Sequence, residues 1–208
     1  MAEPPADAEA WQDALARTVG RRVARYRRAR GLTAQQLSDE LRATLGFDMK
    51  RAVIGNLETG LRRGVGIAEI FALAHILRVP PLLLVVPVGD DDFPMLPVVT
   101  TDPWSAARWV TGEGEPEFLA RTGPADLLQA YRDEVSFLGL YRRHDTEVAR
   151  WRRAARMAGS ADGPVSAGLG EIEDGLRALR WTIRELGSTP PPLPRRLRHL
   201  DAADGTAD

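Results

Sequence analysis

Residues 33–60 read TAQQLSDELRATLGFDMKRAVIGNLETG and hold two short helical patterns separated by a turn. Thr33 suits the N-cap of the first helix, because its hydroxyl can accept a hydrogen bond from a free amide in the first turn. Leu37 and Leu41 then share one face of that helix. Gly46 is expected to break it, because glycine takes a positive φ without a steric cost. This stretch therefore predicts a helix, a turn and a second helix.

The second helix is predicted from about Met49 to Thr59, with Gly60 just beyond its end. Ile54 and Leu57 are expected on its core side. Lys50, Arg51 and Asn56 remain for the other side, where polar side chains are available for a partner.

The flanking sequence extends this pattern in both directions. Upstream, residues 20–33 read GRRVARYRRARGLT, and downstream, residues 58–81 read ETGLRRGVGIAEIFALAHILRVPP. The register RxxRGLTxxxL … IxxLExGxRR … xxxLAxxLxVPP resembles the Xre/Cro-type, or lambda-repressor-like, helix-turn-helix family over about residues 17–86. The arrangement also resembles a group of actinobacterial regulators within that family. The resemblance implies a regulator that binds operator DNA.

Site residues follow from the resemblance and from base chemistry. In the recognition helix, Arg51 suits guanine and Asn56 suits adenine, while Lys50 suits a phosphate or a single guanine acceptor. Val53 is expected either to touch a thymine methyl or to face the core. The loop after Gly60 would place arginines on phosphates, and family members often carry glutamine where this chain has Ala34. The remaining expected DNA contacts are Thr33, Gln35, Gln36, Arg62 and Arg63.

The resemblance also implies an internal ion pair between Arg27 and Glu58, which we interpret as structural. Upstream of it, residues 11–30 are predicted to form an amphipathic helix with Leu15, Val19, Val23 and Tyr26 on its apolar side. The arginines on the other faces, such as Arg22, are either solvated or in contact with phosphate.

Charge is unevenly distributed along the chain. Residues 14–88 contain thirteen basic and five acidic residues, a net charge of +8, whereas the whole chain has a net charge of −1. A basic domain in a nearly neutral chain indicates a polyanionic partner for that domain alone. The absence of cysteine excludes disulfides and thiolate metal sites and favours the cytoplasm. The first residues are not typical of a signal peptide, and no stretch is apolar and long enough to cross a membrane.

Five regions are expected along the chain. Residues 1–10 are predicted to be a disordered tail, 11–88 the helix-turn-helix DNA-binding domain, and 89–123 a linker with a short helix. Residues 124–187 are predicted to form an antiparallel helical hairpin, and 188–208 a proline-rich, disordered tail. The fold class is therefore all-α, an N-terminal lambda-repressor-like domain followed by the hairpin.

The hairpin prediction depends on two apolar stripes. In residues 126–158, Leu128, Tyr131, Val135, Leu138 and then Tyr141 or Arg142 have helical spacing. Residues 142–145 interrupt this stripe before Val148 and Trp151. The second stripe is a strict coiled-coil heptad seam, formed by Val165, Leu169, Ile172, Leu176, Leu179, Ile183 and Leu186. Two helices alone have too little core, so the hairpin is expected to pack on the domain, on a second copy, or both.

Three classes of function fit these features to different degrees. The first is a sequence-specific transcriptional regulator, a repressor by default, that binds a two-fold DNA site as a homodimer. The second is an antitoxin-like or adaptor protein whose residues 124–187 hold a partner protein. An enzyme is not expected, because the sequence has no cysteine nucleophile, glycine-rich phosphate loop or metal-ligand cluster. No cofactor or metal is expected.

Overall fold

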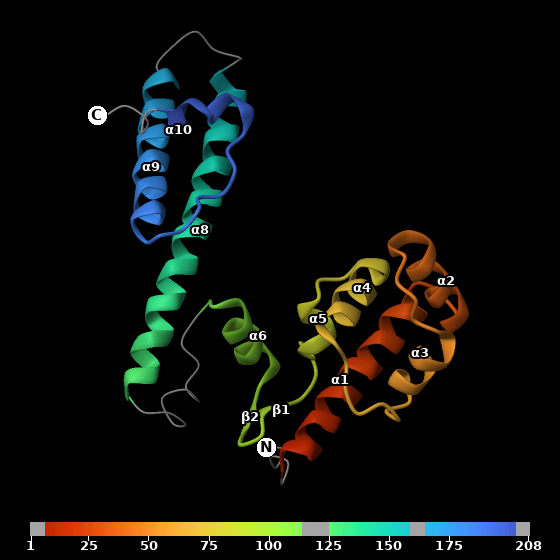
Figure 1. Cartoon of the computed structure of the whole chain (residues 1–208). Helices are drawn as coiled ribbons and strands as arrows, with labels where there is room; N and C mark the ends of the chain where they lie inside the picture. The colour runs from red at the N-terminus through yellow and green to blue at the C-terminus, as the bar shows by residue number, and fades with distance from the viewer. Residues whose placement is uncertain (1–6, 114–124, 159–164, 203–208) are drawn as a thin grey trace. The chain divides into compact units, whose positions relative to one another are not determined.

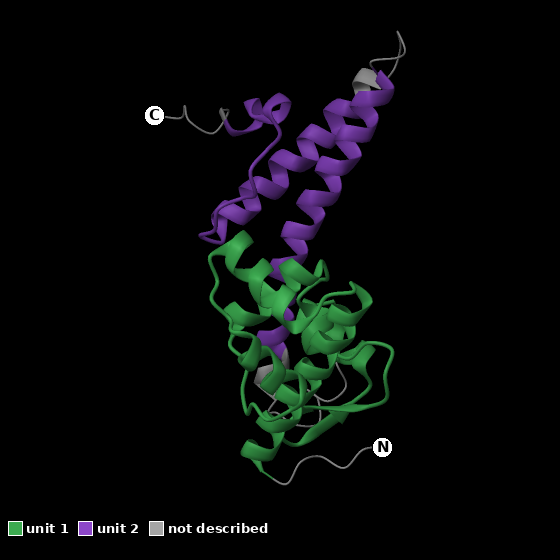
Figure 2. Cartoon of the chain, turned by 90° about the vertical axis from the view of Figure 1, so that its right-hand side faces the viewer, with its two compact units in different colours: residues 1–123 green, residues 124–208 purple. Residues whose placement is uncertain are grey.

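The computed structural model describes residues 7–113, 125–158 and 165–202, although the side chains of 125–128 and 165–167 are not included. These residues are mostly helical, with one two-stranded sheet. The chain divides into unit 1, Met1–Gly123, and unit 2, Pro124–Asp208 (Figure 2). No helix in the described ranges is both long and apolar enough to cross a membrane.

Unit 1 begins with α1 (Ala8–Ala29), followed by α2 (Ala34–Leu45), α3 (Arg51–Glu58), α4 (Ile67–Leu77) and the short α5 (Leu82–Val85) (Figure 1). α1 starts within the predicted tail because the Asp7 carboxylate accepts a hydrogen bond from the Ala10 amide at 2.7 Å. Apolar residues from α1 to α5 form one buried cluster, in which Val23, Leu37, Leu41, Ile54, Leu57, Leu73 and Leu84 are fully buried.

Arg22 ties α1 to α5 and is not a surface residue. Its side chain is only 4% exposed, and its Nε donates to the Leu83 carbonyl oxygen at 2.9 Å. The interpretation of this arginine as solvated or bound to phosphate is therefore wrong. Its guanidinium is used inside the unit, where it also donates to the Tyr26 hydroxyl.

Residues 89–113 are not a simple linker. β1 (Phe93–Leu96) and β2 (Val99–Thr101) pair antiparallel, and α6 (Pro103–Thr111) follows them. Asp102 caps α6 by accepting from the Ser105 amide at 2.9 Å, and hydrogen bonds from the side chain and then the amide of Ser105 lower the pKa of this carboxylic acid. Phe93, Met95, Ala106 and Ala107 form a second small core, which packs against apolar residues of α1 and α5. The domain boundary predicted after residue 88 overlooked this second core, because β1, β2 and α6 are each too short to show in the sequence that they pack on α1 and α5.

Unit 2 contains two long helices, α8 (Ala125–Ala158) and α9 (Val165–Glu185), which pack side by side (Figures 1 and 2). Three of the predicted seam residues of α9, Ile172, Leu176 and Ile183, are buried, whereas Leu186 is 58% exposed. The Val165 side chain lies outside the described residues.

The seam of α8 agrees with the second part of the predicted stripe, at Val148 and Trp151, and differs from its first part. Its buried residues are Leu140, His144, Val148 and Trp151. At 100° per residue, Tyr131, Val135 and Leu138 lie about 150° around the helix from that seam. Leu138 is accordingly 44% exposed. The apolar stripe changes face near residue 139, because only the second half of α8 is covered by α9.

The predicted proline-rich tail folds back onto this helix pair. Residues 188–194 lead into a 3-10 turn, η1 (Arg195–Leu197), and into α10 (His199–Ala202). Leu193, Leu197 and Leu200 are buried against Val148, Trp151 and Leu176. The prediction of disorder is therefore wrong for residues 188–202, because three widely spaced leucines complete the core of unit 2.

Candidate nucleic-acid interface

The start of α2 is fixed by a reciprocal pair of hydrogen bonds. The Thr33 hydroxyl accepts from the Gln36 amide at 3.1 Å, and the Gln36 side-chain oxygen accepts from the Thr33 amide at 2.8 Å. This capping box satisfies two of the free amides at the helix start. It confirms the predicted N-cap, but it also engages two of the residues expected to contact DNA.

The turn between α2 and α3 is held from inside and outside. The buried Ser38 hydroxyl donates to the Met49 carbonyl oxygen at 2.7 Å, and Met49 itself is 2% exposed. Gly46 ends α2 with a φ of 63°, as predicted. On the surface, Arg42 Nη2 lies 2.5 Å from Asp48 Oδ1, and this contact lowers the pKa of the Asp48 carboxylic acid. The turn thus sets α3 in a defined position relative to α2.

α1 approaches α3 at Gly20 more closely than any side chain would allow. A Cβ atom at this position would lie 2.0 Å from the Leu57 carbonyl oxygen. Only glycine can occupy this contact, because a non-bonded carbon and oxygen cannot come so close. This role of Gly20 is not visible in the sequence, since a glycine inside a helical pattern gives no indication of which helix it meets.

The Arg27–Glu58 ion pair also joins these two helices. Arg27 Nε and Nη2 each lie 2.6 Å from a different Glu58 carboxylate oxygen, and Nη1 donates to the Leu32 carbonyl oxygen. Both side chains are largely buried, at 13% and 9% exposed. The hydrogen bonds to Glu58 raise the pKa of Arg27 above its ordinary value. The expected pair is present and fixes the C-terminal end of α3 to α1.

The outward face of α3 has no such packing role. Ile54 and Leu57 are fully buried, whereas Arg51, Ala52, Asn56 and Thr59 are exposed. Gly55 lies among these exposed residues, and a Cβ atom there would meet nothing within 4 Å. Lys50 is exposed just before the helix. This face therefore offers side-chain donors at its start and two small residues, the exposed Ala52 and the half-buried Gly55, at its centre.

Other predicted contact residues are already engaged within unit 1. Gln35 Nε2 donates to Asp39 Oδ1 at 2.9 Å, and Arg62 Nη1 lies 2.7 Å from Glu69 Oε1. Val53 is half-buried and packs against the core, which is the second of its two predicted roles. Arg63 is 80% exposed and lies 3.8 Å from the exposed Glu9. Lys50, Arg51, Asn56 and Arg63 are exposed, as are Thr33, Gln35 and Gln36.

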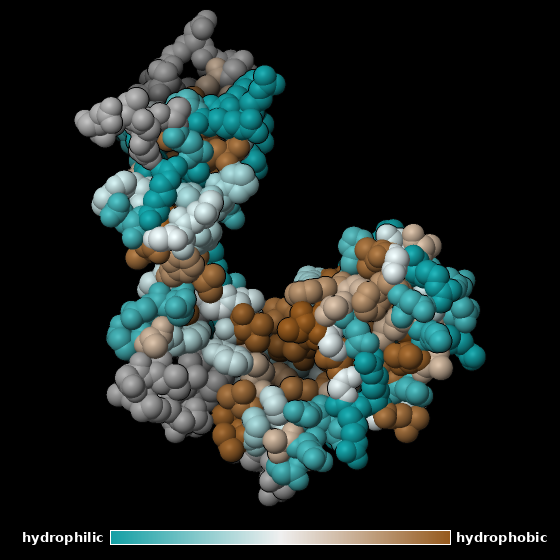
Figure 3. Space-filling view, viewed as in Figure 1, coloured by the Kyte–Doolittle hydropathy of each residue, from teal (hydrophilic) through white to brown (hydrophobic). Residues whose placement is uncertain are grey.

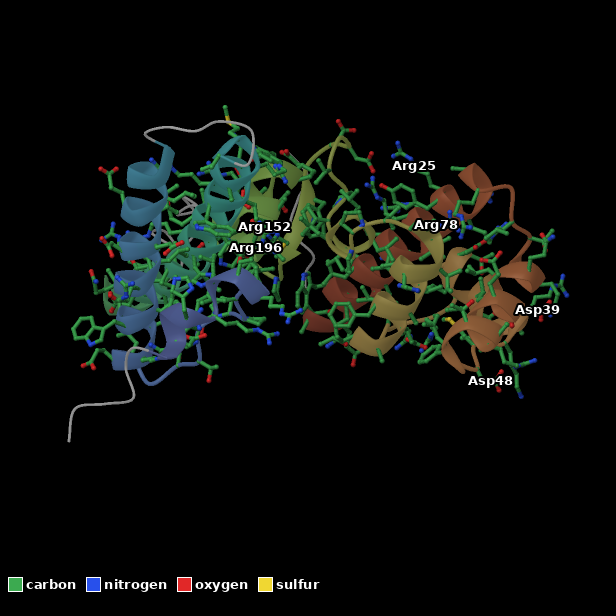
Figure 4. All side chains as sticks on the ribbon, turned by 90° about the horizontal axis from the view of Figure 1, so that it is seen from above. Arg25, Asp39, Asp48, Arg78, Arg152 and Arg196 are labelled. Carbon is green, nitrogen blue, oxygen red and sulfur yellow. The ribbon has the colours of Figure 1, made fainter. Side chains whose placement is uncertain are left out.

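Two carboxylates lie beside the candidate interface. Asp39 of α2 and Asp48 of the turn project from the same end of unit 1 (Figure 4). They would repel phosphates unless paired, and Asp48 is paired with Arg42. Asp39 accepts a hydrogen bond from the neutral Gln35 amide, so its charge disfavours polyanion contact near the middle of α2.

The described residues contain no group of three or more histidine, aspartate or glutamate side chains placed to hold a metal ion. Comparison of the chain with protein-family models, with curated proteins and with solved structures finds no match.

Proposed function

We propose that this chain is a sequence-specific DNA-binding regulator of the Xre/Cro type, in which α2 and α3 act as a helix-turn-helix and α3 is the recognition helix. The observation that carries the proposal is the division of α3 into two faces. One face is buried and tied to α1 and α2, and the other presents Arg51, Asn56 and a small centre to solvent. Such a helix can enter a major groove without disturbing its own core.

The proposed contacts divide into two kinds. Arg51 reads guanine and Asn56 reads adenine through paired hydrogen bonds. Lys50 and Arg63 bind phosphates, which position the protein without reading sequence. Arg62 contributes only if it exchanges Glu69 for a phosphate, since the two side chains are paired in the free protein. The net charge of +8 over residues 14–88 supports binding that weakens steeply with salt.

We also propose that the regulator acts as a homodimer through the antiparallel pair of helices in unit 2. A two-fold DNA site requires a two-fold protein, and two recognition helices would then enter major grooves about 34 Å apart. Repression by occlusion of a promoter is the simplest action of such a dimer.

A first test is selection of fragmented genomic DNA by the purified chain at near-physiological salt, followed by sequencing. Recovery of a few sites that share a two-fold motif is the expected result. Uniform, weak recovery of all fragments would contradict sequence-specific binding.

Arg51→Ala tests the reading of bases. We expect it to weaken binding to the selected site by about 1–3 kcal/mol and to relax the preference at one base position. Arg153→Ala is the matched control, because it removes the same charge from an exposed position of α8 in unit 2. Titration of fluorescent DNA sites that differ at single positions measures both effects. An equal loss for every sequence would make Arg51 a phosphate contact.

One observation favours the second candidate function, a protein-binding adaptor. Leu61, Ile67 and Phe71 are 77%, 72% and 58% exposed in the loop after α3 and in α4. Ile67 and Phe71 lie four residues apart and share one face of α4, and exposed apolar side chains that lie together often mark a protein interface. DNA selection separates the candidates, since an adaptor with secondary DNA binding would not select a shared two-fold motif by itself.

A further inference from the structure

The first half of α8 extends beyond the end of α9. α8 has 34 residues and α9 has 21, a difference of about 20 Å in length at 1.5 Å per residue. The chain leaves α9 at Gly187, which has a φ of 74°, and Tyr141 Oη donates to the Thr189 carbonyl oxygen at 3.0 Å. The return segment therefore contacts α8 near Tyr141 and leaves the turns before it uncovered by α9.

A groove of about 570 Å³ lies along this exposed part of α8. Its apolar floor includes Phe137 and Leu140, and Leu186 stands at its edge with 58% of its surface exposed. Asp133 lines the groove on the N-terminal side of this apolar floor, and Arg143 lines it on the C-terminal side. Figure 3 shows apolar surface on α8 at the level where α9 ends. The groove thus continues the side of α8 that α9 covers, with unlike charges at its two ends.

The charges of the groove are self-complementary. Residue 138 lies midway between Asp133 and Arg143, and also midway between Ser136 and Leu140. Suppose that two copies of α8 pack antiparallel about a two-fold axis at the level of residue 138. A residue a given number of positions before 138 then lies at the same level as the residue that many positions after 138 in the other copy. Asp133 of each copy then faces Arg143 of the other, and Ser136 faces Leu140. Glu134 and Arg142 are related about the same point.

We infer that this groove is the dimer interface, and that its occupant is α8 of a second copy, packed antiparallel on the groove side of α8 with the two-fold axis at the level of residue 138. A two-fold pairing of identical chains satisfies both ends of the groove at once, because the same surface patch meets itself. The pairing covers Phe137, Leu140 and Leu186 in both copies and gives four helices around a common core, which is a stable way to complete a two-helix unit. The inference rests on the proposed homodimer and not on DNA binding.

Charge exchange tests the pairing. Sedimentation equilibrium of the full chain without DNA is expected to show a dimer. Asp133→Arg and Arg143→Asp should each raise the dimer dissociation constant about tenfold or more, because each places two like-charged pairs across the interface. The variant with both substitutions should recover most of the wild-type affinity. Arg153→Asp, an equal charge change at an exposed position of the same helix, should have no effect.

Two outcomes of this experiment overturn the inference. One is a chain that stays monomeric at all concentrations. The other is a doubly substituted variant that is folded by circular dichroism but no more dimeric than the single variants.

Distance measurement gives a test that does not depend on tolerance of charge. The chain has no cysteine, so a single introduced cysteine can carry a spin label. About an axis at residue 138, labels at Ser136→Cys would be displaced along the helices by only about 6 Å, and labels at Arg153→Cys by about 45 Å. A short distance at position 136 with a long one at 153 is expected. Similar distances at both positions would overturn the antiparallel pairing.

These measurements are separable from the DNA experiments. A monomer that still selects a DNA motif would refute the interface and leave the proposed regulator in place. A dimer with the expected distances that selects no DNA motif would support the interface and refute the proposed regulator.

Discussion

Arg27 in unit 1 and Arg180 in unit 2 are both bound by carboxylates, but at different places in their cores. Arg27 lies at the edge of a continuous apolar cluster and joins α1 to α3. The Arg180 side chain of α9 is 5% exposed and lies between His144 of α8 and the returning C-terminal segment. It donates to Asp201 Oδ1 at 2.6 Å and to the Pro191 carbonyl oxygen at 2.6 Å.

The difference shows two ways to complete a small helical unit. Unit 1 is held by apolar residues from helices that follow one another in sequence. The Arg27–Glu58 ion pair joins two of these helices, α1 and α3. Unit 2 has two helices with too little apolar surface between them, so a segment from the end of the chain supplies three leucines and a carboxylate. Unit 1 should therefore be most sensitive to changes in helix packing, and unit 2 to loss or protonation of its polar centre.

The largest effect is expected at the closest contact of unit 1. Gly20→Ala should destabilise this unit by more than about 5 kcal/mol, enough to leave it unfolded, because the added Cβ overlaps the Leu57 carbonyl. Gly55→Ala is the matched control and should be neutral or up to about 1 kcal/mol more stable, since its Cβ meets nothing. Hydrogen exchange by mass spectrometry reports each unit separately. Protection of α1 and α3 that survives in Gly20→Ala would refute the close contact.

The next effect concerns unit 2. A chain that stops after Gly187 loses the buried Leu193, Leu197 and Leu200 and should lose on the order of 5 kcal/mol in the stability of unit 2. Amides of α8 and α9 should then exchange rapidly while those of unit 1 stay protected. As a control, alanine at the exposed Arg195 and Arg196 should change little. Unchanged protection of α9 in the shortened chain would show that residues 188–202 are not needed for the core.

Glu58→Ala should cost about 3 kcal/mol, because it leaves the largely buried Arg27 guanidinium without its carboxylate. The matched comparison is Asp48→Ala, which breaks an ion pair that is more than half exposed and should change stability far less than Glu58→Ala does. Thermal unfolding followed by circular dichroism measures both variants. Equal effects of the two substitutions would remove the structural role assigned to Glu58.

The smallest effect is a dependence of unit 2 on pH. Arg180 Nη1 donates to His144 Nε2 at 2.9 Å, so this nitrogen must be unprotonated. Burial lowers the pKa of His144 below its ordinary value of 6.5, and the charge of Arg180 lowers it further. Asp145, which lies 3.8 Å from Nδ1, and Asp201, which is bound to Arg180, act in the opposite direction.

The sign of this effect follows from the protons bound. Above the unfolded pKa the histidine is neutral in both states and unit 2 keeps its full stability. Below it, the unfolded chain binds a proton that the folded chain does not, so stability falls as the pH falls from about 6.5 toward the lower folded pKa. The slope is at most about 1.4 kcal/mol per pH unit. In His144→Gln this part of the slope should vanish, and an unchanged slope would assign the effect to other groups.

The start of α2, its end at Gly46 and the buried face of α3 could be predicted from the sequence, because capping residues, glycine and helical spacing act within a few residues of the chain. The Arg27–Glu58 pair was also predictable, but only through resemblance to a family. The local hydrogen bonds of Thr33, Gln35 and Gln36 within unit 1 were harder to predict, since these side chains look available in the sequence.

What the sequence alone determined is therefore local: which segments are helical, where those helices begin and end, and which positions are apolar. The tertiary structure decided which apolar positions meet. It placed Gly20 against Leu57, buried Arg22, moved the seam of α8 to a new face and folded residues 188–202 over the helix pair. Each of these contacts joins residues far apart in the chain, and periodicity reports the direction of a side chain along its own helix but not the surface it will meet.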